Sequence, residues 1–373
     1  MTTHHMVSSN LEDETSVFRQ SLNDGREAIY FDDPASSHDH SLRIDKRVPE
    51  NRSEGTTMRF DPLTDEWIAI APKRNSRSHL PAKEACPLCP QTVDNLSDAP
   101  GPFDVVVFEN KSPSFGPSLE ERPSRPSDTN FDFRAPAAGR CEVVVFSPDH
   151  VGSFATLPAA RVATVLSAWT HRTAELKALP GVESVFPFEN RGEEIGVTLH
   201  HPHGQIYAYP FIPPRVQQVL TAVSKKRDTF FEDYVEFESS SERTIARTDN
   251  FVAFVPFAPR WPLEIVVMPL RAIADFTELT EQEREELVDL LPRVLLTLDS
   301  LHGSAVPYIS AWYQAPVGLT GQEFRFHLRI TSPKRSKDRL KILAGSETAM
   351  GAFILDVTPE IQAGQLRELA AEL

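Results

Sequence analysis

The sequence has only three cysteines, Cys86, Cys89 and Cys141, among 373 residues. So few thiols, in an odd number, exclude the disulfide framework of a small secreted domain. Basic residues are also in the minority, with 38 Lys and Arg against 53 Asp and Glu and a formal net charge of -15. Because phosphate backbones are held by clustered Lys and Arg, this balance excludes a broad nucleic-acid-binding surface. A few local arginines could still hold one small phosphate ligand.

Long hydrophobic runs are missing as well. No stretch approaches the roughly 18 apolar residues that a membrane helix needs, and the N-terminus lacks a basic region followed by an apolar run. We therefore expect a cytoplasmic protein without a membrane partner. With 40% hydrophobic residues, the chain can bury a full core, as two domains or as one large α/β unit.

Two segments lack apolar periodicity. Residues 1–55 are polar, and we expect a largely disordered extension there because little apolar burial offsets the ordering entropy. Order should begin near Met58, with a strand at 67–70. Residues 112–140 carry five prolines and predict a long loop.

The rest of the chain suggests an internal duplication. A strand at 141–146, a helix within 157–179 and strands at 182–190 and 198–210 are followed by a weaker repeat of the same order. The repeat consists of 263–280, 281–301, 306–316 and 323–333. We predict an α+β fold with domains at 56–215 and 216–373, in which the two copies form one mostly antiparallel sheet flanked by helices.

The segment "HHPHGQIYAYP", residues 200–210, concentrates polar side chains on an expected strand. Side chains alternate along a strand, so His201, His203 and Gln205 should share one face. In an apolar core each would need a hydrogen-bond partner or a metal. The alternative is a solvated strand face.

Cys86 and Cys89 in "ACPLCP" have the two-residue spacing that lets both thiolates reach one tetrahedral zinc ion. A redox pair is the first alternative, but such pairs usually open a helix after a strand, and this segment is turn-like. Two ordinary loop thiols are the second. Zinc would need two further ligands, for which His150 and a histidine of the strand motif are candidates.

Four ordered motifs carry a family resemblance. "DPLTDEWIAIAPKRNSR", "CPLC", "FSPDH" and "FENRGEEIGVTLHHPHGQIYA" resemble galactose-1-phosphate uridylyltransferases of the histidine-triad superfamily, over residues 59–347. The resemblance implies that the two halves are histidine-triad-like units.

The resemblance also implies a mechanism. His203 would be the nucleophile that takes a uridylyl group from UDP-glucose, and galactose 1-phosphate would then remove it as UDP-galactose in a ping-pong reaction of galactose metabolism. Gln205 matches the glutamine that hydrogen-bonds a phosphoryl oxygen. An amide cannot readily activate water as an imidazole can, so this residue favours a transferase over a hydrolase.

Further site residues follow from the same resemblance. His201 falls on a zinc-ligand position, completing a closed structural set with Cys86, Cys89 and His150. Arg74 and Arg77 match paired arginines that reach into a neighbouring subunit, which implies a homodimer; their alternative is a solvated basic turn. Other matched nucleotide- or hexose-binding positions are Asn110, Asn190, Gly196, Thr198, Lys341 and Glu347.

Some positions depart from the family pattern. Thr198 replaces a common serine, and Leu199-His200 replaces a common Asn-Pro. The positions of a second metal site of some relatives are occupied by Val219, Tyr313, His327 and Arg329. We expect no second metal, and expect His327 to be a hydrogen-bonded structural histidine.

Two other functions remain open from the sequence. One is a phosphorylase-like enzyme that passes adenylyl from ADP-glucose to inorganic phosphate. The other is a non-catalytic nucleotide-binding sensor.

Overall fold

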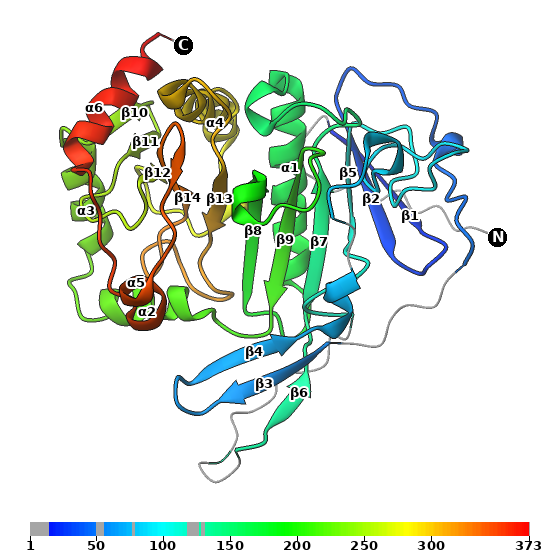
Figure 1. Ribbon diagram of the computed structural model, residues 1–373, viewed down its shortest axis with the longest axis horizontal. Helices are drawn as coiled ribbons and strands as arrows, with labels where there is room; N and C mark the ends of the chain where they lie inside the picture. The colour runs from blue at the N-terminus through cyan, green and yellow to red at the C-terminus, as the bar shows by residue number, and fades with distance from the viewer. Residues whose placement is uncertain (1–14, 50–55, 77–78, 118–126, 128–130, 373) are drawn as a thin grey trace. The chain divides into compact units, whose positions relative to one another are not determined.

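The computed structural model describes residues 15–49, 56–76, 79–117, 127 and 131–372, with its elements labelled in Figure 1. The chain divides into two compact units. Unit 1 comprises the described parts of 1–187 and 198–215, and unit 2 comprises those of 188–197 and 216–373. Among the described residues, none of the helices combines the length and apolar character that crossing a membrane requires.

Unit 1 is built on a sheet with the strand order β1-β2-β5-β7-β9-β8. The pairs from β1 to β9 are antiparallel. In Figure 1 helix α1 runs along this sheet, and it contacts β2 and β5. The elements are β1 (Ser16–Ser21), β2 (Glu27–Asp32), β5 (Val105–Glu109), β7 (Arg140–Val145), α1 (Ala159–Lys177), β8 (Ser184–Arg191) and β9 (His203–Tyr209).

A smaller antiparallel sheet in unit 1 has the order β4-β3-β6. Its third strand lies within the segment for which the sequence predicted only a long loop. The strands are β3 (Thr57–Asp61), β4 (Glu66–Ile70) and β6 (Arg134–Pro136).

Unit 2 starts with the second half of β8, and its strands follow the order β8-β13-β14-β12-β11-β10. All of these pairs are antiparallel. Helix α6 contacts both α4 and β10. The strands are β10 (Thr244–Arg247), β11 (Phe251–Phe254), β12 (Leu263–Pro269), β13 (Tyr308–Tyr313), β14 (His327–Ser332) and a hairpin of β15 (Lys334–Ser336) and β16 (Arg339–Leu340). The helices are α2 (Pro214–Val223), α3 (Phe230–Ser239), α4 (Glu281–His302), α5 (Gly345–Met350) and α6 (Pro359–Ala370).

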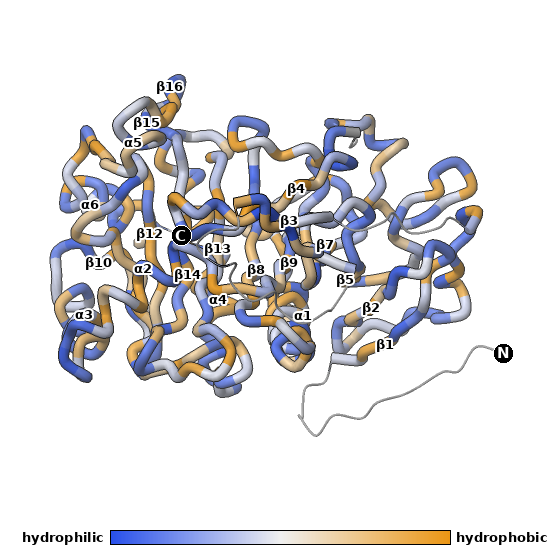
Figure 2. The backbone as a smooth tube through the Cα atoms, turned by 90° about the horizontal axis from the view of Figure 1, so that it is seen from below, coloured by the Kyte–Doolittle hydropathy of each residue, from blue (hydrophilic) through white to orange (hydrophobic). Residues whose placement is uncertain are grey.

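Local sequence explains the bounds of the longest helix. Helix α4 begins after Thr280, whose side chain accepts a hydrogen bond from the backbone of Glu283 while Glu283 bonds back to Thr280. It ends at Gly303, which has a φ of 62°, a conformation that glycine adopts without steric cost. In Figure 2 hydrophobic stretches recur along the strands and helices of each unit and alternate with hydrophilic ones.

The predicted α+β architecture, with a large, mostly antiparallel sheet and flanking helices, is confirmed. The predicted repeat is also visible in the strand order. In unit 1 the elements β7, α1, β8 and β9 pair as β7-β9-β8, and in unit 2 the elements β12, α4, β13 and β14 pair as β12-β14-β13. Each copy therefore places its fourth element between its first and third.

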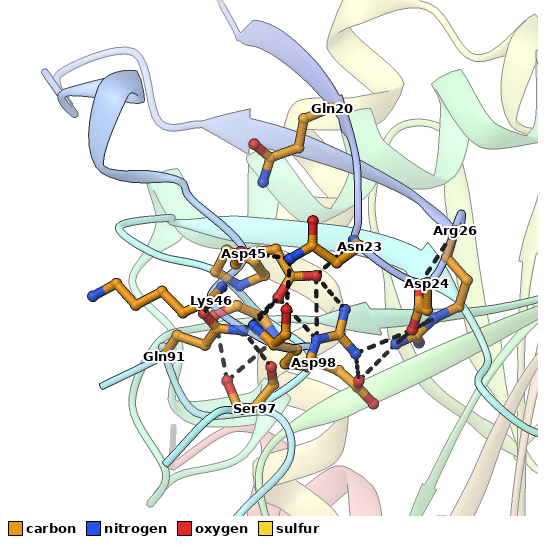
Figure 3. A network of polar contacts seen from close by, with 12 residues as sticks. Gln20, Asn23, Asp24, Arg26, Asp45, Lys46, Gln91, Ser97 and Asp98 are labelled. Atoms are coloured by element: carbon orange, nitrogen blue, oxygen red, sulfur yellow. Dashed lines mark hydrogen bonds and ion pairs between the residues drawn. The ribbon is translucent and has the colours of Figure 1, made fainter. Parts of the chain in front are cut away.

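The N-terminal segment requires a correction. Residues 15–49 of the extension expected to be disordered hold β1 and β2, and Ala28–Phe31 are almost fully buried. Arg26, only 2% exposed, pairs with Asp24 at 2.7 Å and with Asp98 at 2.6 Å (Figure 3). The charged residues that suggested disorder form ion pairs inside the fold, which compensates the cost of burying them. The rest of that expectation concerns residues 1–14 and 50–55, which lie outside the described residues.

A buried ion pair fixes α1 to the strand beside β9. One edge of the Arg172 guanidinium bonds the Glu142 carboxylate, with Nε to Oε2 at 2.9 Å and Nη2 to Oε1 at 2.7 Å. Glu142 lies on β7 directly opposite Ile206 of β9. This pair therefore ties the helix to β7, the strand that pairs with β9.

Replacing one partner of this pair should destabilise the protein. We expect Arg172→Met to lower the free energy of unfolding by about 3 kcal/mol, because Glu142 stays buried without its cation. Urea unfolding followed by fluorescence measures the change. The double variant Arg172→Met/Glu142→Met should regain most of the loss, and a double variant as unstable as the single one would contradict this explanation.

Candidate functional site

His203 is the first residue of β9 and pairs with Val145 of β7. Its Nδ1 lies 2.7 Å from the backbone oxygen of His201. A carbonyl oxygen can only accept, so Nδ1 carries the hydrogen and Nε2 keeps a free lone pair. Burial lowers the pKa of His203 below its ordinary value. The ring is therefore a neutral imidazole at neutral pH, with its nucleophilic nitrogen defined.

The face of β9 that carries His203 continues with polar and aromatic side chains. His203, Gln205, Tyr207 and Tyr209 are half-buried, whereas the residues between them are buried. Gln205 thus follows His203 on the same face, as the sequence predicted. His201, however, precedes the strand, because β9 begins at His203, so strand alternation does not place its side chain.

Four side chains that the sequence selected as metal ligands lie together. One donor atom each from Cys86, Cys89, His150 and His201 lies within 4.8 Å of the others. The Cys89 sulfur is 3.5 Å from Nδ1 of His150 and 3.5 Å from Nδ1 of His201, and the Cys86 sulfur is 3.8 Å from Nδ1 of His201. Tetrahedral zinc, with bonds of about 2.3 Å to sulfur and about 2.1 Å to nitrogen, separates such atoms by about 3.6 Å. The cluster therefore has the dimensions of a tetrahedral metal site.

The protonation state of the cluster also suits a cation. Nε2 of His201 donates to the backbone oxygen of Ser147 at 2.7 Å, which leaves its Nδ1 free to face the two sulfurs. Burial is the main cause that lowers the pKa of His201 to about 4. Burial and the neighbouring Cys86 thiol raise the pKa of Cys89 to about 12. Two adjacent thiolates are thus unfavourable here unless a positive charge compensates them.

Loops next to strands bring these ligands together. Cys86 follows a short 3-10 helix at Lys83–Ala85, and its carbonyl accepts from the Asn95 amide at 2.8 Å. His150 follows β7, and His201 precedes β9. Because β7 and β9 are adjacent antiparallel strands, the end of one lies beside the start of the other.

Three other expected site residues lie in unit 1. Arg74, in the 3-10 helix Pro72–Ser76, donates to the backbone oxygen of Ser112 at 3.3 Å and lines a surface cavity of about 590 Å³. Asn110 follows β5, and its side-chain oxygen accepts from the Ser112 backbone at 2.9 Å. Ser112 therefore links Arg74 and Asn110. The Thr198 carbonyl accepts from Leu80 at 2.9 Å, and Arg77 lies outside the described residues.

Unit 2 holds the remaining expected residues. Asn190 pairs with Ile309 across β8 and β13, and Gly196 has a φ of 86° with open space where a Cβ would stand. Lys341 is buried, forms an ion pair with Glu347 at 3.2 Å and donates to the Ile354 carbonyl. Lys341 also lines a cavity of about 320 Å³.

His327 begins β14 as His203 begins β9. Its Nδ1 donates to the Arg325 carbonyl at 2.8 Å, and its ring stacks on Tyr313 with centroids 4.9 Å apart. Burial is the main cause that lowers its pKa to about 3. Arg329 forms an ion pair with Glu264. The prediction that His327 is hydrogen-bonded is confirmed.

Sequence reasoning missed two contributors. The Ser147 carbonyl orients His201, yet a backbone contact leaves no signal in residue types. Trp261 lines the same cavity as Lys341, although 80 positions separate them in the sequence and only the fold brings them together.

The chain is similar in sequence to known proteins. Residues 46–213 match the N-terminal domain and residues 216–373 the C-terminal domain of galactose-1-phosphate uridyl transferase. The galactose-1-phosphate uridylyltransferase of Streptomyces lividans is 36% identical over 94% of this chain and 96% of that protein. The one of Thermotoga maritima is 36% identical over 85% and 99%.

Solved structures agree with the sequence matches. A uridylyltransferase structure superposes with a TM-score of 0.74 at 32% identity, covering 85% of this chain and 99% of that one. An ADP-glucose phosphorylase from Arabidopsis thaliana shares the fold, with a TM-score of 0.62 at 22% identity over 83% and 98%. From the two domain matches and these relatives, the chain belongs to the galactose-1-phosphate uridylyltransferase family.

Proposed function

We propose that the protein transfers a uridylyl group between UDP-glucose and galactose 1-phosphate through a covalent intermediate on His203. The observation that carries this proposal is the hydrogen bond from His203 Nδ1 to the His201 carbonyl, which leaves Nε2 as a neutral nucleophile. The names of the relatives supply the substrate class. The Leloir pathway of galactose metabolism would use this exchange.

The reaction divides into two displacements. The Nε2 lone pair of His203 attacks the α-phosphorus of UDP-glucose, an N–P bond forms, and the P–O bond to glucose 1-phosphate breaks. A phosphate oxygen of galactose 1-phosphate then attacks the same phosphorus, and the N–P bond breaks to release UDP-galactose. The imidazole returns to its starting state. Throughout, Nδ1–H remains on the His201 carbonyl and stabilises the positive charge that develops on the ring.

Gln205, the next residue on the same strand face, would hydrogen-bond a phosphoryl oxygen during both steps. Its amide has no titratable proton near neutral pH, so it cannot serve as a general base for water. The intermediate would therefore persist until a sugar phosphate arrives.

For the metal, we propose structural zinc held by Cys86, Cys89, His150 and His201. Four protein ligands leave no open coordination position, so the ion would fix the chain around His201 without contacting phosphate. Zinc thiolates also require reduced cysteines, which supports a reducing compartment such as the cytoplasm.

We propose roles in substrate binding for the remaining expected residues. We propose Arg74, Arg77, Asn110 and Thr198, together with Asn190 and Gly196, for the nucleotide and its phosphates, because guanidinium groups and backbone amides suit phosphate oxygens. Lys341 and Glu347 would contact the hexose.

We also propose a homodimer. The family resemblance places Arg74 and Arg77 in a neighbouring subunit's site, and unit 2 exposes apolar side chains near Lys341. Ile342 is 85% exposed and Met350 is 80% exposed. Apolar side chains this accessible suit burial against a second copy.

Removing the nucleophile tests the proposed chemistry. His203→Gly should lower the transfer rate at least about 10⁴-fold, because the variant lacks the imidazole that would form the N–P bond. The assay measures UDP-galactose formed from UDP-glucose and galactose 1-phosphate, with zinc content and circular dichroism as controls for folding. Full turnover by the variant would remove His203 from the mechanism. Adenylyl transfer from ADP-glucose to inorganic phosphate by the wild type, without uridylyl transfer, would replace the proposed donor.

Removing one ligand tests the metal. Cys86→Ser should lower bound zinc, measured by plasma mass spectrometry, and lower the melting temperature, because a three-ligand set retains the ion poorly. Cys141→Ser is the matched control, since this cysteine lies in β7 outside the cluster. Unchanged zinc in the Cys86 variant would contradict the ligand set.

A further inference from the structure

Two of the four metal-binding side chains lie on a stretch with little secondary structure. Residues 86–104, here called the cysteine loop, contain neither a helix nor a strand apart from an isolated bridge between Pro90 and Ala99. Cys86 is 1% exposed and Cys89 is half-buried. No strand ladder holds this loop. A few internal backbone bonds, such as the one from Gln91 to the Ala99 carbonyl at 3.0 Å, and contacts with other segments hold its conformation.

Charged contacts from the N-terminal segment, residues 15–47, reach the middle of the loop. Arg26 donates to Asp98 at 2.6 Å, and Arg47 also pairs with Asp98. The backbone amide of Asp98 in turn donates to the carbonyl of Pro87 at 2.9 Å. Pro87 directly follows Cys86. The two arginines therefore hold Asp98, and Asp98 in turn holds the turn between Cys86 and Cys89. Figure 3 shows Asp98 at the centre of this network.

An amide makes a second connection. The Gln91 side chain accepts from the backbone of Lys46 at 3.0 Å and donates to Asp45 at 3.0 Å. It also donates to the carbonyl of Ser97 at 2.7 Å. Gln91 lies two residues after Cys89, and it joins both arms of the cysteine loop to the N-terminal segment (Figure 3).

The remaining contacts close the far end of the loop. The Tyr30 hydroxyl donates to the Pro100 carbonyl at 2.9 Å, and Arg43 Nε donates to the Pro102 carbonyl at 2.8 Å. Leu22 and Tyr30 belong to the same buried hydrophobic cluster as Cys86. The cysteine loop therefore has ionic, amide and apolar contacts with the N-terminal segment.

This segment lies largely outside the matched family domain, which begins at residue 46. Residues 15–45 thus form a layer beside the cysteine loop that lies outside the matched domain. Strand β2 places the layer by pairing with β5, the strand that follows the cysteine loop.

We propose that residues 15–47 act as a clamp that holds the cysteine loop in its metal-binding conformation, and that they are positioning residues for the zinc site. The inference rests on the metal site proposed above. Loss of the clamp would let Cys86 and Cys89 move away from His150 and His201, so that metal would be released faster and the chain around His203 would lose its support.

The test uses the full-length chain with three substitutions. Arg26→Met removes one of the two ionic contacts with Asp98, and Gln91→Met removes the amide contact at a half-buried position that tolerates an apolar side chain. Arg19→Met is the matched control, because Arg19 lies in β1 but pairs with Glu27 and Glu175, neither of which belongs to the cysteine loop.

The first measurement is the rate at which iodoacetamide labels each cysteine in metal-free protein, read by peptide mass spectrometry. Cys141, 1% exposed in β7, reports global unfolding. We expect Arg26→Met and Gln91→Met to speed labelling of Cys86 and Cys89 at least about tenfold, because a lost hydrogen bond shifts local opening by this order. Labelling of Cys141 should not change, and Arg19→Met should behave as the wild type.

The second measurement is the rate of zinc release from loaded protein to a chromogenic chelator, which should rise in the same two variants. Unchanged labelling of Cys86 in both variants would overturn the clamp, and so would equal acceleration at all three cysteines, since global unfolding then explains the effect. Absence of zinc from the wild-type protein would instead refute the proposed metal site, while the labelling of metal-free protein would still decide the clamp. Gln91→Met keeps the test decisive if Arg26→Met fails to fold.

Discussion

The hydrogen bond from His203 Nδ1 to the His201 carbonyl is the interaction on which the site depends. It fixes the tautomer of His203, the proposed nucleophile, and ties it to a residue whose ring belongs to the cluster that could hold a metal. The ring of His201 is held in turn by the Ser147 carbonyl. Two backbone carbonyls therefore decide which nitrogen of each histidine is free, and a metal at the cluster would support the chain that presents His203 without taking part in the chemistry.

A comparison of His327 in unit 2 with His203 in unit 1 shows which features come from the shared topology and which come from the surrounding side chains. His327 begins β14 in the position that His203 has in β9, and it makes the same hydrogen bond to the residue two places before it. Around it, however, lie the stacked ring of Tyr313 and the ion pair of Arg329 with Glu264. The duplicated topology thus reproduces the histidine tautomer. Among the described residues, unit 2 has no cluster of side chains that could hold a metal. The cysteine loop and its cluster therefore distinguish unit 1.

Much of this arrangement could be predicted from the sequence, because periodicity and motif spacing are local properties. The helix within 157–179 and the repeated strand-helix-strand-strand unit followed from residue types and their order. The family resemblance predicted the convergence of Cys86, Cys89, His150 and His201. The ordered N-terminal segment could not be predicted in this way. Its charged residues are typical of a solvated polar tail. The ion pairs of Arg26 and Arg47 with Asp98, which lies far along the chain, cannot be predicted from local sequence. The start of β9 at His203 was also missed, because the pattern does not show where the ladder begins.

The proposed reaction depends on a covalent bond between His203 Nε2 and phosphorus. The most direct measurement is mass spectrometry of the intact protein after incubation with UDP-glucose alone, with peptide mapping of the product and subsequent addition of galactose 1-phosphate. We expect a uridylyl adduct on His203 that disappears as UDP-galactose forms. A folded, zinc-loaded protein that forms UDP-galactose without any adduct, or with an adduct on another residue, would contradict it.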